Sequence, residues 1–291
     1  MLCGEYAVLS GATAFALPTI KGQRLKAEVR ESSKHPHLEW KALDRNGNIW
    51  FEAGISMGNL LLEYSTDPLV AIQLVRFLIN ARALNPQFLT EPHNIRVETT
   101  LEFDTDEGLG SSSTLTNNIA QWAGVNPFAL HFSAFKGSGF DVAVARMGEP
   151  LLYTMNGNDP VIETVKWDKP FRDKLFLIHL NKKQNSRDEI AAHRRPVTTA
   201  QIAQISRISR LLSVNDDYFE FCLLLELAES ETAQILGVQP VKQRLFSDFQ
   251  GSIKSLGAWG GDYILACGED VPAYFKSKGY PRIYTFNELI K

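Results

Sequence analysis

One short stretch of this 291-residue chain gathers glycines and serines, Gly108-Leu109-Gly110-Ser111-Ser112-Ser113. Glycines let backbone N–H groups approach a bound anion closely, and a helix that starts at the serines would add the positive end of its dipole. The hydroxyls could hold phosphate oxygens or Mg²⁺, which keeps several waters and takes few protein ligands. The stretch therefore predicts a phosphate site. A serine-capped helix after a turn is the alternative, because neither GxxxxGKS/T nor the complete GxGxxG motif is present.

A carboxylate follows a second glycine-containing stretch, residues 136–143 (KGSGFDVA). Asp141 is expected to face whatever this flexible turn surrounds, and the nearby Lys136 would keep its carboxylate ionised at neutral pH. An ionised Asp141 could accept a hydroxyl proton during phosphoryl transfer. The alternative is an ordinary turn or helix cap. A third stretch, 257–262 (GAWGGD), follows Lys254, and by itself it indicates only a bend or bulge.

Hydrophobic periodicity predicts the elements that position these stretches. Alternation predicts two short strands joined by a turn, at 4–18 and 23–32, and further strands at 48–54, 94–103, 151–156, 174–180 and 282–286. Helical spacing or the absence of breakers predicts helices at 68–84, 201–213 and 218–236, and another that starts among the serines, with Ser111 to Ser113 as candidate caps. Because strands and helices alternate irregularly, an α+β fold is favoured over a doubly wound sheet. The lobe boundary is expected near 168–170.

The composition excludes several classes of partner. With 30 basic and 33 acidic residues the formal charge is -3, so nothing draws the whole chain to nucleic acid or to an anionic membrane. No apolar run reaches about 18 residues, and Glu5 interrupts the apolar start, so neither a transmembrane helix nor a signal peptide is expected. Cys3, Cys222 and Cys267 lack CxxC spacing, which predicts buried thiols in a reducing compartment. We expect a cytoplasmic monomer or homodimer that acts on a small molecule.

Taken together, the motifs resemble those of the GHMP kinases and follow the family order: 4–12 (GEYAVLSGA), 107–114 (EGLGSSST) and 256–262 (LGAWGGD). GEYAV with GSGFDVA is most similar to the mevalonate-pathway branch, and within it to phosphomevalonate kinase more than to GEH-type mevalonate kinases. The resemblance implies a two-lobed α+β fold, with an N-terminal ribosomal-protein-S5-like lobe over 1–168, its first strand partly missing, and a C-terminal ferredoxin-like lobe over 169–291. It also implies a kinase that uses ATP and Mg²⁺ to phosphorylate mevalonate or 5-phosphomevalonate.

The same resemblance assigns roles to individual residues. The ATP phosphates would contact Gly108, Leu109, Gly110, Ser111, Ser112 and Ser113, with Ser112 also a metal ligand, and Asp141 would be the catalytic base. The acceptor side would include Glu5, Tyr6, Lys136, Ser138 and Gly139, together with Lys183, Ser186 and Arg187 in a basic loop that could equally be a solvated turn. Gly257, Gly260 and Gly261 would shape the floor of the site.

Several positions depart from the family pattern. The family lysine falls two residues before Met1, Asp104 replaces a common proline, and Trp259 replaces a small residue. Leu130 stands where mevalonate kinases carry a second acidic Mg²⁺ ligand, and the adjacent His131 is more typical of a structural residue. Two further hypotheses therefore stay open: a GHMP kinase for a sugar, homoserine or another alcohol, and an ATP-binding homologue with impaired catalysis.

Overall fold

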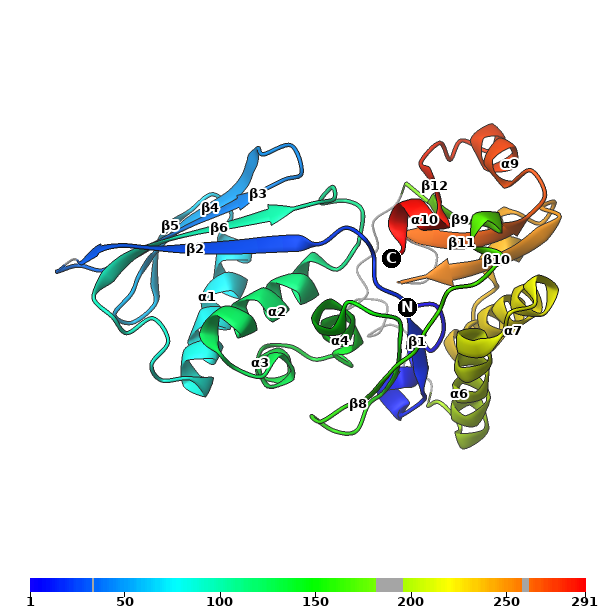
Figure 1. The fold of residues 1–291 in the computed structure, drawn as a ribbon, viewed down its shortest axis with the longest axis horizontal. Helices are drawn as coiled ribbons and strands as arrows, with labels where there is room; N and C mark the ends of the chain where they lie inside the picture. The colour runs from blue at the N-terminus through cyan, green and yellow to red at the C-terminus, as the bar shows by residue number, and fades with distance from the viewer. Residues whose placement is uncertain (33, 182–195, 258–261) are drawn as a thin grey trace. The chain divides into compact units, whose positions relative to one another are not determined.

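A computed structural model describes residues 1–32, 34–181, 196–257 and 262–291, which group into two compact units (Figure 1). One unit comprises Lys21–Arg146, and the other joins Met1–Ile20 to Met147–Lys291. The contacts within the chain thus place the first twenty residues with the C-terminal half. The lobes expected at 1–168 and 169–291 remain a proposal about domain organisation.

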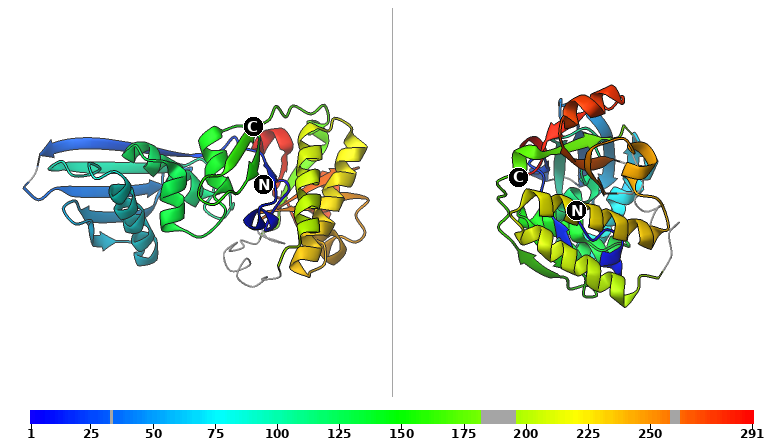
Figure 2. Two further views of the ribbon diagram at one scale, coloured as in Figure 1. Left: turned by 90° about the horizontal axis from the view of Figure 1, so that it is seen from below. Right: turned by 90° about the vertical axis from the view of Figure 1, so that its right-hand side faces the viewer.

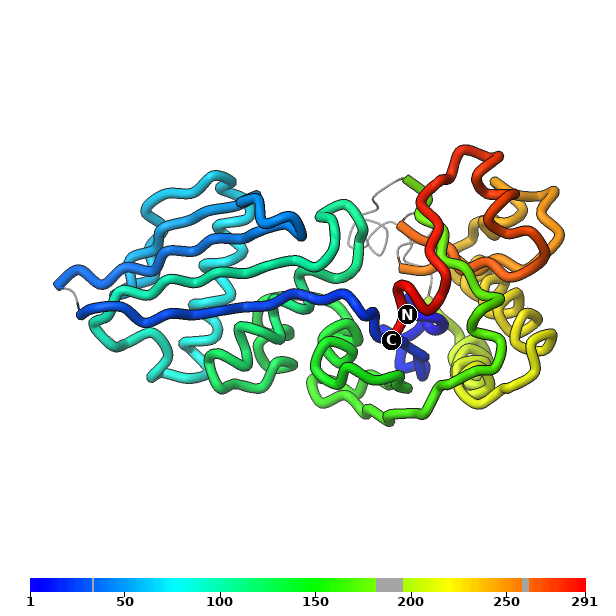
Figure 3. Tube along the Cα trace, turned by 45° about the horizontal axis from the view of Figure 1, so that its top comes forward, coloured from blue at the N-terminus to red at the C-terminus, as the bar shows by residue number. Residues whose placement is uncertain are grey.

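The unit formed by Lys21–Arg146 is a five-stranded sheet with helices on one face (Figures 1 and 3). Its strands lie in the order β2-β6-β3-β4-β5, and every neighbouring pair is antiparallel except β3 with β6. They are β2 (Gln23–Ser32), β3 (His37–Leu43), β4 (Ile49–Ser56), β5 (Leu61–Ser65) and β6 (His93–Leu101). The helices are α1 (Pro68–Leu84), α2 (Ser111–Ala123), α3 (Pro127–Ala134) and α4 (Phe140–Met147), which crosses the unit boundary at its last residue.

The apolar side chains of β6 and α1 form part of the core of this unit, because the sequence patterns of the two elements place them on one face. Ile95, Val97, Thr99 and Leu101 are buried on one face of β6, as predicted. Helix α1 begins where the Asp67 carboxylate accepts hydrogen bonds from the N–H groups of Leu69 and Val70. Its inner face buries large apolar side chains, each worth about 1.5–3 kcal/mol, and these are Leu74, Phe77 and Leu78.

In the second unit, the strands that the structure describes form two antiparallel sheets. The smaller sheet has the order β1-β7-β8, with β1 (Ala14–Ala16), β7 (Leu151–Thr154) and β8 (Val161–Thr164). The larger has the order β10-β11-β9-β12, with β9 (Leu175–His179), β10 (Gly251–Leu256), β11 (Tyr263–Gly268) and β12 (Ile283–Thr285). Mainly antiparallel sheets with segregated helices confirm the α+β class.

Two long helices, α6 (Thr199–Val214) and α7 (Tyr218–Leu236), run side by side in this unit (Figure 2). Helix α6 begins at a capping box between Thr198 and Gln201, and α7 ends at Gly237 in the left-handed conformation. The other helical segments among the described residues are η1 (Ala7–Ser10), η2 (Arg172–Lys174), α8 (Val241–Leu245), α9 (Val271–Ser277) and α10 (Phe286–Leu289). Within the described ranges, none of the helices combines the length and the apolar character needed to cross a bilayer.

The strand expected across 4–18 is only partly correct. Ala7–Ser10 form the 3₁₀ helix η1, and only Ala14–Ala16 form a strand. The backbone turns because Gly4 has a φ of 105° and Tyr6 a φ of 62°, conformations that cannot continue a strand. A Cβ on Gly4 would lie 2.6 Å from the Cα of Ala14, so the close return of the chain also requires glycine here.

Candidate active site

The glycine and serine stretch forms the connection between β6 and α2, as predicted. Gly108 and Gly110 have φ angles of 65° and 81°, the left-handed region that favours glycine. Gly110 is the N-cap of α2, and the N–H groups of Ser113 and Thr114 return to its carbonyl oxygen at 3.0 and 3.1 Å. The predicted serine caps are therefore wrong: the cap is a glycine without a side-chain acceptor.

A glycine cap has a chemical consequence. The first N–H groups of a helix have no acceptor within the helix, and a serine, threonine or aspartate cap normally supplies one. Gly110 cannot do so, while the side chains of Ser111 and Ser112 are exposed and Ser113 is half-buried. The start of α2 thus presents backbone donors, hydroxyls and a positive dipole end to an anion.

Sequence reasoning missed the charged support beneath this loop. Glu107 is 1% exposed, and its carboxylate accepts a hydrogen bond from the N–H of Asp104 at 3.0 Å. The Nζ of Lys21 lies 3.4 Å from Oε1 of Glu107. The buried carboxylate of Glu107 thereby stabilises the turn that begins at Asp104. Lys21 compensates the negative charge of Glu107, which would otherwise repel a bound phosphate. The only sequence signal was an acidic residue directly before the first glycine of the loop.

Asp141 lies in the first turn of α4, behind Gly137 and Gly139, whose φ angles are 147° and 74°. Asp141 is exposed to solvent, and desolvation by the protein around it raises its pKa to about 6. Lys136 does not set the pKa of Asp141, contrary to expectation, because desolvation dominates. The carboxylate is still mostly ionised at pH 7, and a pKa near the working pH suits a general base.

The helices that carry the loop and the aspartate are joined directly. The side-chain amide of Asn117 on α2 donates a hydrogen bond to the carbonyl oxygen of Ala145 on α4 at 3.5 Å. Helix α2 is also held to β2, because Thr114 donates to the Gln23 side chain at 2.9 Å. The phosphate-type loop and the candidate base therefore belong to one packed framework.

Glu5 and Tyr6, predicted to face the acceptor, lie in the other unit. Glu5 is 7% exposed, and its Oε1 accepts a hydrogen bond from the Nζ of Lys254 on β10 at 3.0 Å. Its Oε2 has no hydrogen-bond partner among the described residues. Tyr6 is half-buried and packs against the apolar core between α7 and the larger sheet.

Lys254 connects Glu5 to a second buried carboxylate, that of Glu229, and the sequence did not reveal this contact. The Nζ of Lys254 lies 3.5 Å from Oε2 of Glu229, and Lys254 is itself fully buried. Glu229 also accepts hydrogen bonds from the N–H and hydroxyl groups of Ser255, both at 2.9 Å. Burial alone would lower the pKa of Lys254, but the carboxylates of Glu5 and Glu229 outweigh it and raise that pKa. We name Glu5, Lys254, Glu229 and Ser255 the buried charge network.

The other predicted residues fall into two groups. Lys136 is exposed, Ser138 and Gly139 are buried, and Gly257 directly follows β10 with a φ of 72°. Five predicted residues lie outside the described residues, namely Lys183, Ser186, Arg187, Gly260 and Gly261. Their assignments stay predictions.

The described residues also limit how Mg²⁺ could bind. They contain no group of three or more His, Cys, Asp or Glu side chains that could hold a metal. Leu130 is fully buried in the core of its unit and brings no ligand, while the His131 ring meets Phe132 edge to face and Phe135 at a tilted angle. The exposed hydroxyl of Ser112 fits a Mg²⁺ ion carried mainly by nucleotide phosphates and water.

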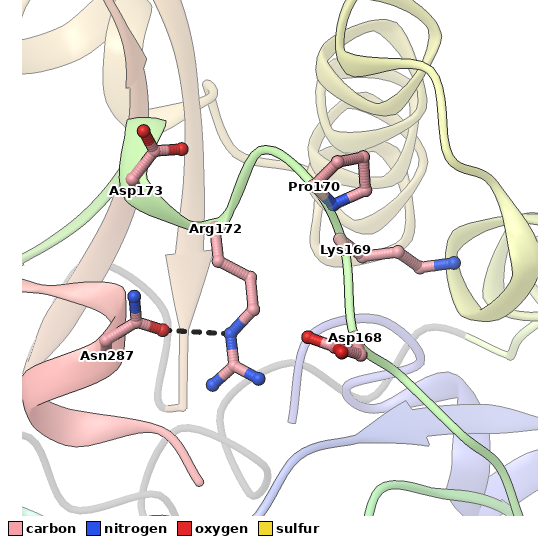
Figure 4. Close-up of a pocket in the computed structure, with 6 residues that line it drawn as sticks. All are labelled: Asp168, Lys169, Pro170, Arg172, Asp173 and Asn287. Carbon is pink, nitrogen blue, oxygen red and sulfur yellow. Dashed lines mark hydrogen bonds between the residues drawn. The ribbon is translucent and has the colours of Figure 1, made fainter.

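A surface depression of about 390 Å³ lies elsewhere, in the second unit (Figure 4). Its cations are already engaged: the Nζ of Lys169 pairs with Asp216 at 2.9 Å, and Arg172 donates to Oδ1 of Asn287 at 2.9 Å and to the carbonyl oxygen of Ile290 at 3.2 Å. None of the predicted site residues lines it; the lining consists of Asp168, Lys169, Pro170, Arg172, Asp173 and Asn287. We interpret it as a structural surface feature.

Comparison with known proteins identifies the fold. No protein-family model matches the sequence, and no curated protein matches it. Among solved structures, the Methanococcus jannaschii mevalonate kinase matches with a TM-score of 0.67 at 12% identity, covering 97% of this chain and 93% of that chain. The chain has the fold of the GHMP kinases.

Other GHMP kinase structures agree over nearly the whole chain. Streptococcus pneumoniae phosphomevalonate kinase, in complex with phosphomevalonate and AMPPNP, matches with a TM-score of 0.64 at 14% identity, covering 95% of this chain and 92% of that chain. Lactococcus lactis galactokinase, complexed with galactose, matches with a TM-score of 0.66 at 14% identity, covering 100% of this chain and 90% of that chain. At these identities the likeness establishes the fold, so the activity has to be argued from the site residues.

Proposed function

We propose that this chain is an ATP-dependent phosphotransferase that transfers the γ-phosphate to a small molecule. The observation that carries the proposal is the glycine-capped start of α2, where Gly110 leaves helix N–H groups open beside the exposed Ser111 and Ser112. Such an arrangement binds anionic phosphate oxygens. The loop joins a strand to a helix within the GHMP kinase fold, in which one solved structure holds AMPPNP.

In the proposed mechanism each part of the site has one task. The backbone N–H groups at the start of α2 bind the phosphates and stabilise the charge that develops on the transferred group. The hydroxyl of Ser112 would hold a Mg²⁺ ion that arrives with the nucleotide, and this ion would supply charge neutralisation. The acceptor oxygen attacks the γ-phosphorus, the bond to the ADP oxygen breaks, and Asp141 takes the proton of an acceptor hydroxyl.

Mevalonate and 5-phosphomevalonate are the first candidate acceptors. The GEYAV and GSGFDVA motifs favour this branch, and solved structures of the same fold include a mevalonate kinase and a phosphomevalonate kinase. Glu5, Tyr6, Lys136, Ser138 and Gly139 are the proposed acceptor-side residues. The similarly strong likeness to a galactokinase keeps a sugar or another alcohol as the second candidate.

The two mevalonate-pathway acceptors place different demands on Asp141. A hydroxyl acceptor must lose a proton during transfer, whereas a phosphate monoester, with a second pKa near 6, is largely ionised at pH 7. Asp141→Asn should therefore impair transfer to mevalonate more than transfer to 5-phosphomevalonate. The ratio of the two losses distinguishes a catalytic base from a residue that only shapes the site.

ADP formation tests the proposal directly. The purified full chain with Mg·ATP should release ADP in proportion to one acceptor from a panel at equal concentration: mevalonate, 5-phosphomevalonate, galactose and homoserine. Product identification by mass spectrometry separates acceptor phosphorylation from ATP hydrolysis. Turnover with none of these acceptors, or ADP release that is independent of the acceptor, would contradict the proposal.

Nucleotide binding without transfer is the competing function, and Leu130 favours it. This buried apolar residue stands where the resemblance places a second acidic metal ligand. Calorimetry distinguishes the two: Mg·ATP binding with micromolar affinity and no turnover on any acceptor would establish a binding protein.

A matched pair of glycine variants tests the phosphate loop. Gly110→Ala should destabilise the protein by about 1–2 kcal/mol, because alanine is strained in the left-handed region, although its Cβ would meet no atom within 4 Å. Gly47→Ala is the control, since Gly47 has a similar φ of 83° and equally open surroundings in the β3–β4 turn.

Urea unfolding should give similar losses of stability for both variants. Only Gly110→Ala should also raise the Kd for Mg·ATP, by about tenfold, the cost of one lost hydrogen bond to a charged phosphate. Equal Mg·ATP affinities in the two variants would remove the loop from the nucleotide site.

A further inference from the structure

Two cysteines that are 45 positions apart in the chain meet in the second unit. Cys222 lies in the first turns of α7, and Cys267 lies on β11. Their Sγ atoms are 2.9 Å apart, although neither takes part in a disulfide. This separation exceeds a disulfide bond length by only about 0.9 Å, so a small side-chain rotation brings the sulfurs within bonding distance.

The two thiols differ in access and in acidity. Cys222 is half-buried and open to a small oxidant, whereas Cys267 is 1% exposed. The hydrogen bond between the two sulfur atoms lowers the pKa of the Cys222 thiol. The same contact, together with burial, raises the pKa of Cys267. Because the thiolate is the reactive form, Cys222 is the residue that meets an oxidant first and Cys267 is the residue that resolves it.

The third cysteine lacks these properties. Cys3 is fully buried, and its Sγ contacts the carbonyl oxygen of Ile205 at 4.0 Å. Burial raises its pKa to about 12, so it holds little thiolate at neutral pH. It provides an internal control of the same residue type.

We propose that Cys222 and Cys267 form a dithiol that hydrogen peroxide converts reversibly into an intramolecular disulfide. The Cys222 thiolate attacks one peroxide oxygen, the O–O bond breaks, and, with one proton taken up, a sulfenic acid and one water result. The Cys267 thiol then loses its proton and attacks the Cys222 sulfur, and the sulfenic oxygen leaves as a second water. Overall the two thiols are oxidised by two electrons and one peroxide is reduced to two waters.

The bond would fasten α7 to the larger sheet. Glu229 lies two helical turns along α7 from Cys222 and holds Ser255 on β10 through two hydrogen bonds. The disulfide therefore adds a covalent link beside the buried charge network, and it restricts the unfolded chain. We expect oxidation to raise the Tm of the protein by about 10 °C. This inference is independent of the proposed kinase activity.

Thiol counting on the full chain tests the proposal. The reduced protein, counted after unfolding, should show the three thiols that its sequence contains. The native protein, treated with peroxide, freed of excess peroxide and then unfolded, should show two fewer. Dithiothreitol should restore both. Peptide mass mapping should find the peptide of Cys222 joined to that of Cys267, and the oxidised protein should run as a single chain on a non-reducing gel.

Cysteine variants identify which two residues form the disulfide. Cys3→Ser should still lose two thiols and gain the rise in Tm, whereas Cys222→Ser should lose none. Cys267→Ala should stop at a dimedone-reactive sulfenic acid on Cys222. A wild-type protein that keeps all three thiols, that over-oxidises Cys222 without consuming Cys267, or that pairs Cys222 with Cys3 or with a second molecule would overturn the proposal.

Discussion

Replacing Asp141 by asparagine should lower kcat for a hydroxyl acceptor by about 10²- to 10⁴-fold, the usual contribution of a general base. The change removes the proton acceptor but keeps the shape and the position of the side chain in the first turn of α4. Mg·ATP binding should stay within a few-fold of the original, since the proposed phosphate site is at the start of α2 and does not include Asp141. Steady-state kinetics and calorimetry on the same preparation separate the two effects.

The pH dependence should confirm which group is responsible. Desolvation raises the pKa of Asp141 to about 6, so the base is ionised above that pH and protonated below it. The kcat/KM of the unmodified protein should therefore be level above about pH 7 and fall about tenfold per unit below about pH 5.5. Asp141→Asn should lose this acidic limb.

Asp159→Asn is the matched control, because Asp159 is exposed in the turn between β7 and β8 and is not one of the proposed site residues, while the substitution is chemically the same. It should leave both kcat and the pH profile unchanged. If Asp141→Asn retained full activity, or kept the acidic limb, Asp141 could not be the base.

The sequence predicted well those features that depend on neighbours along the chain. Helices α1 and α7 match the predicted ranges 68–84 and 218–236, because their apolar spacing and flanking caps are local signals. The strand, loop and helix around Gly108 to Ser113 are predictable for the same reason. The alternation in β6 and the glycines that end it are signals between adjacent residues.

Features that depend on tertiary packing escaped prediction. Glu107 and Lys21 pair across 86 positions of the chain, and Lys254 and Glu5 across 249. A lysine in a strand normally faces solvent, so the sequence gives no sign that Lys254 is buried. Only the folded chain shows that the carboxylates of Glu5 and Glu229 compensate its buried charge. The raised pKa of Asp141 likewise depends on surrounding protein rather than on Lys136, its neighbour in sequence.

Replacing Lys254 by methionine should destabilise the second unit by about 3–5 kcal/mol, since removal of one partner leaves buried charges uncompensated. Lys254 is fully buried between Glu5 and Glu229, at 3.0 and 3.5 Å, and it also donates to the carbonyl oxygen of Ser255 at 2.6 Å. A loss of this size is a large part of the whole stability of a typical domain. Urea unfolding measures it, and Lys276→Met on the exposed side of α9 should change stability by less than about 0.5 kcal/mol.

A second substitution separates lost charge compensation from lost packing. In the Lys254→Met background, Glu5→Gln removes one of the two uncompensated carboxylates, so it should recover about 1–2 kcal/mol, whereas alone it should destabilise. Glu5 rather than Glu229 is the residue to change, because Glu229 also binds Ser255 and Val241, while Oε2 of Glu5 has no partner among the described residues. Additive losses in the double variant would mean that Lys254 contributes through packing of its stem, and the two carboxylates would then need another source of compensation.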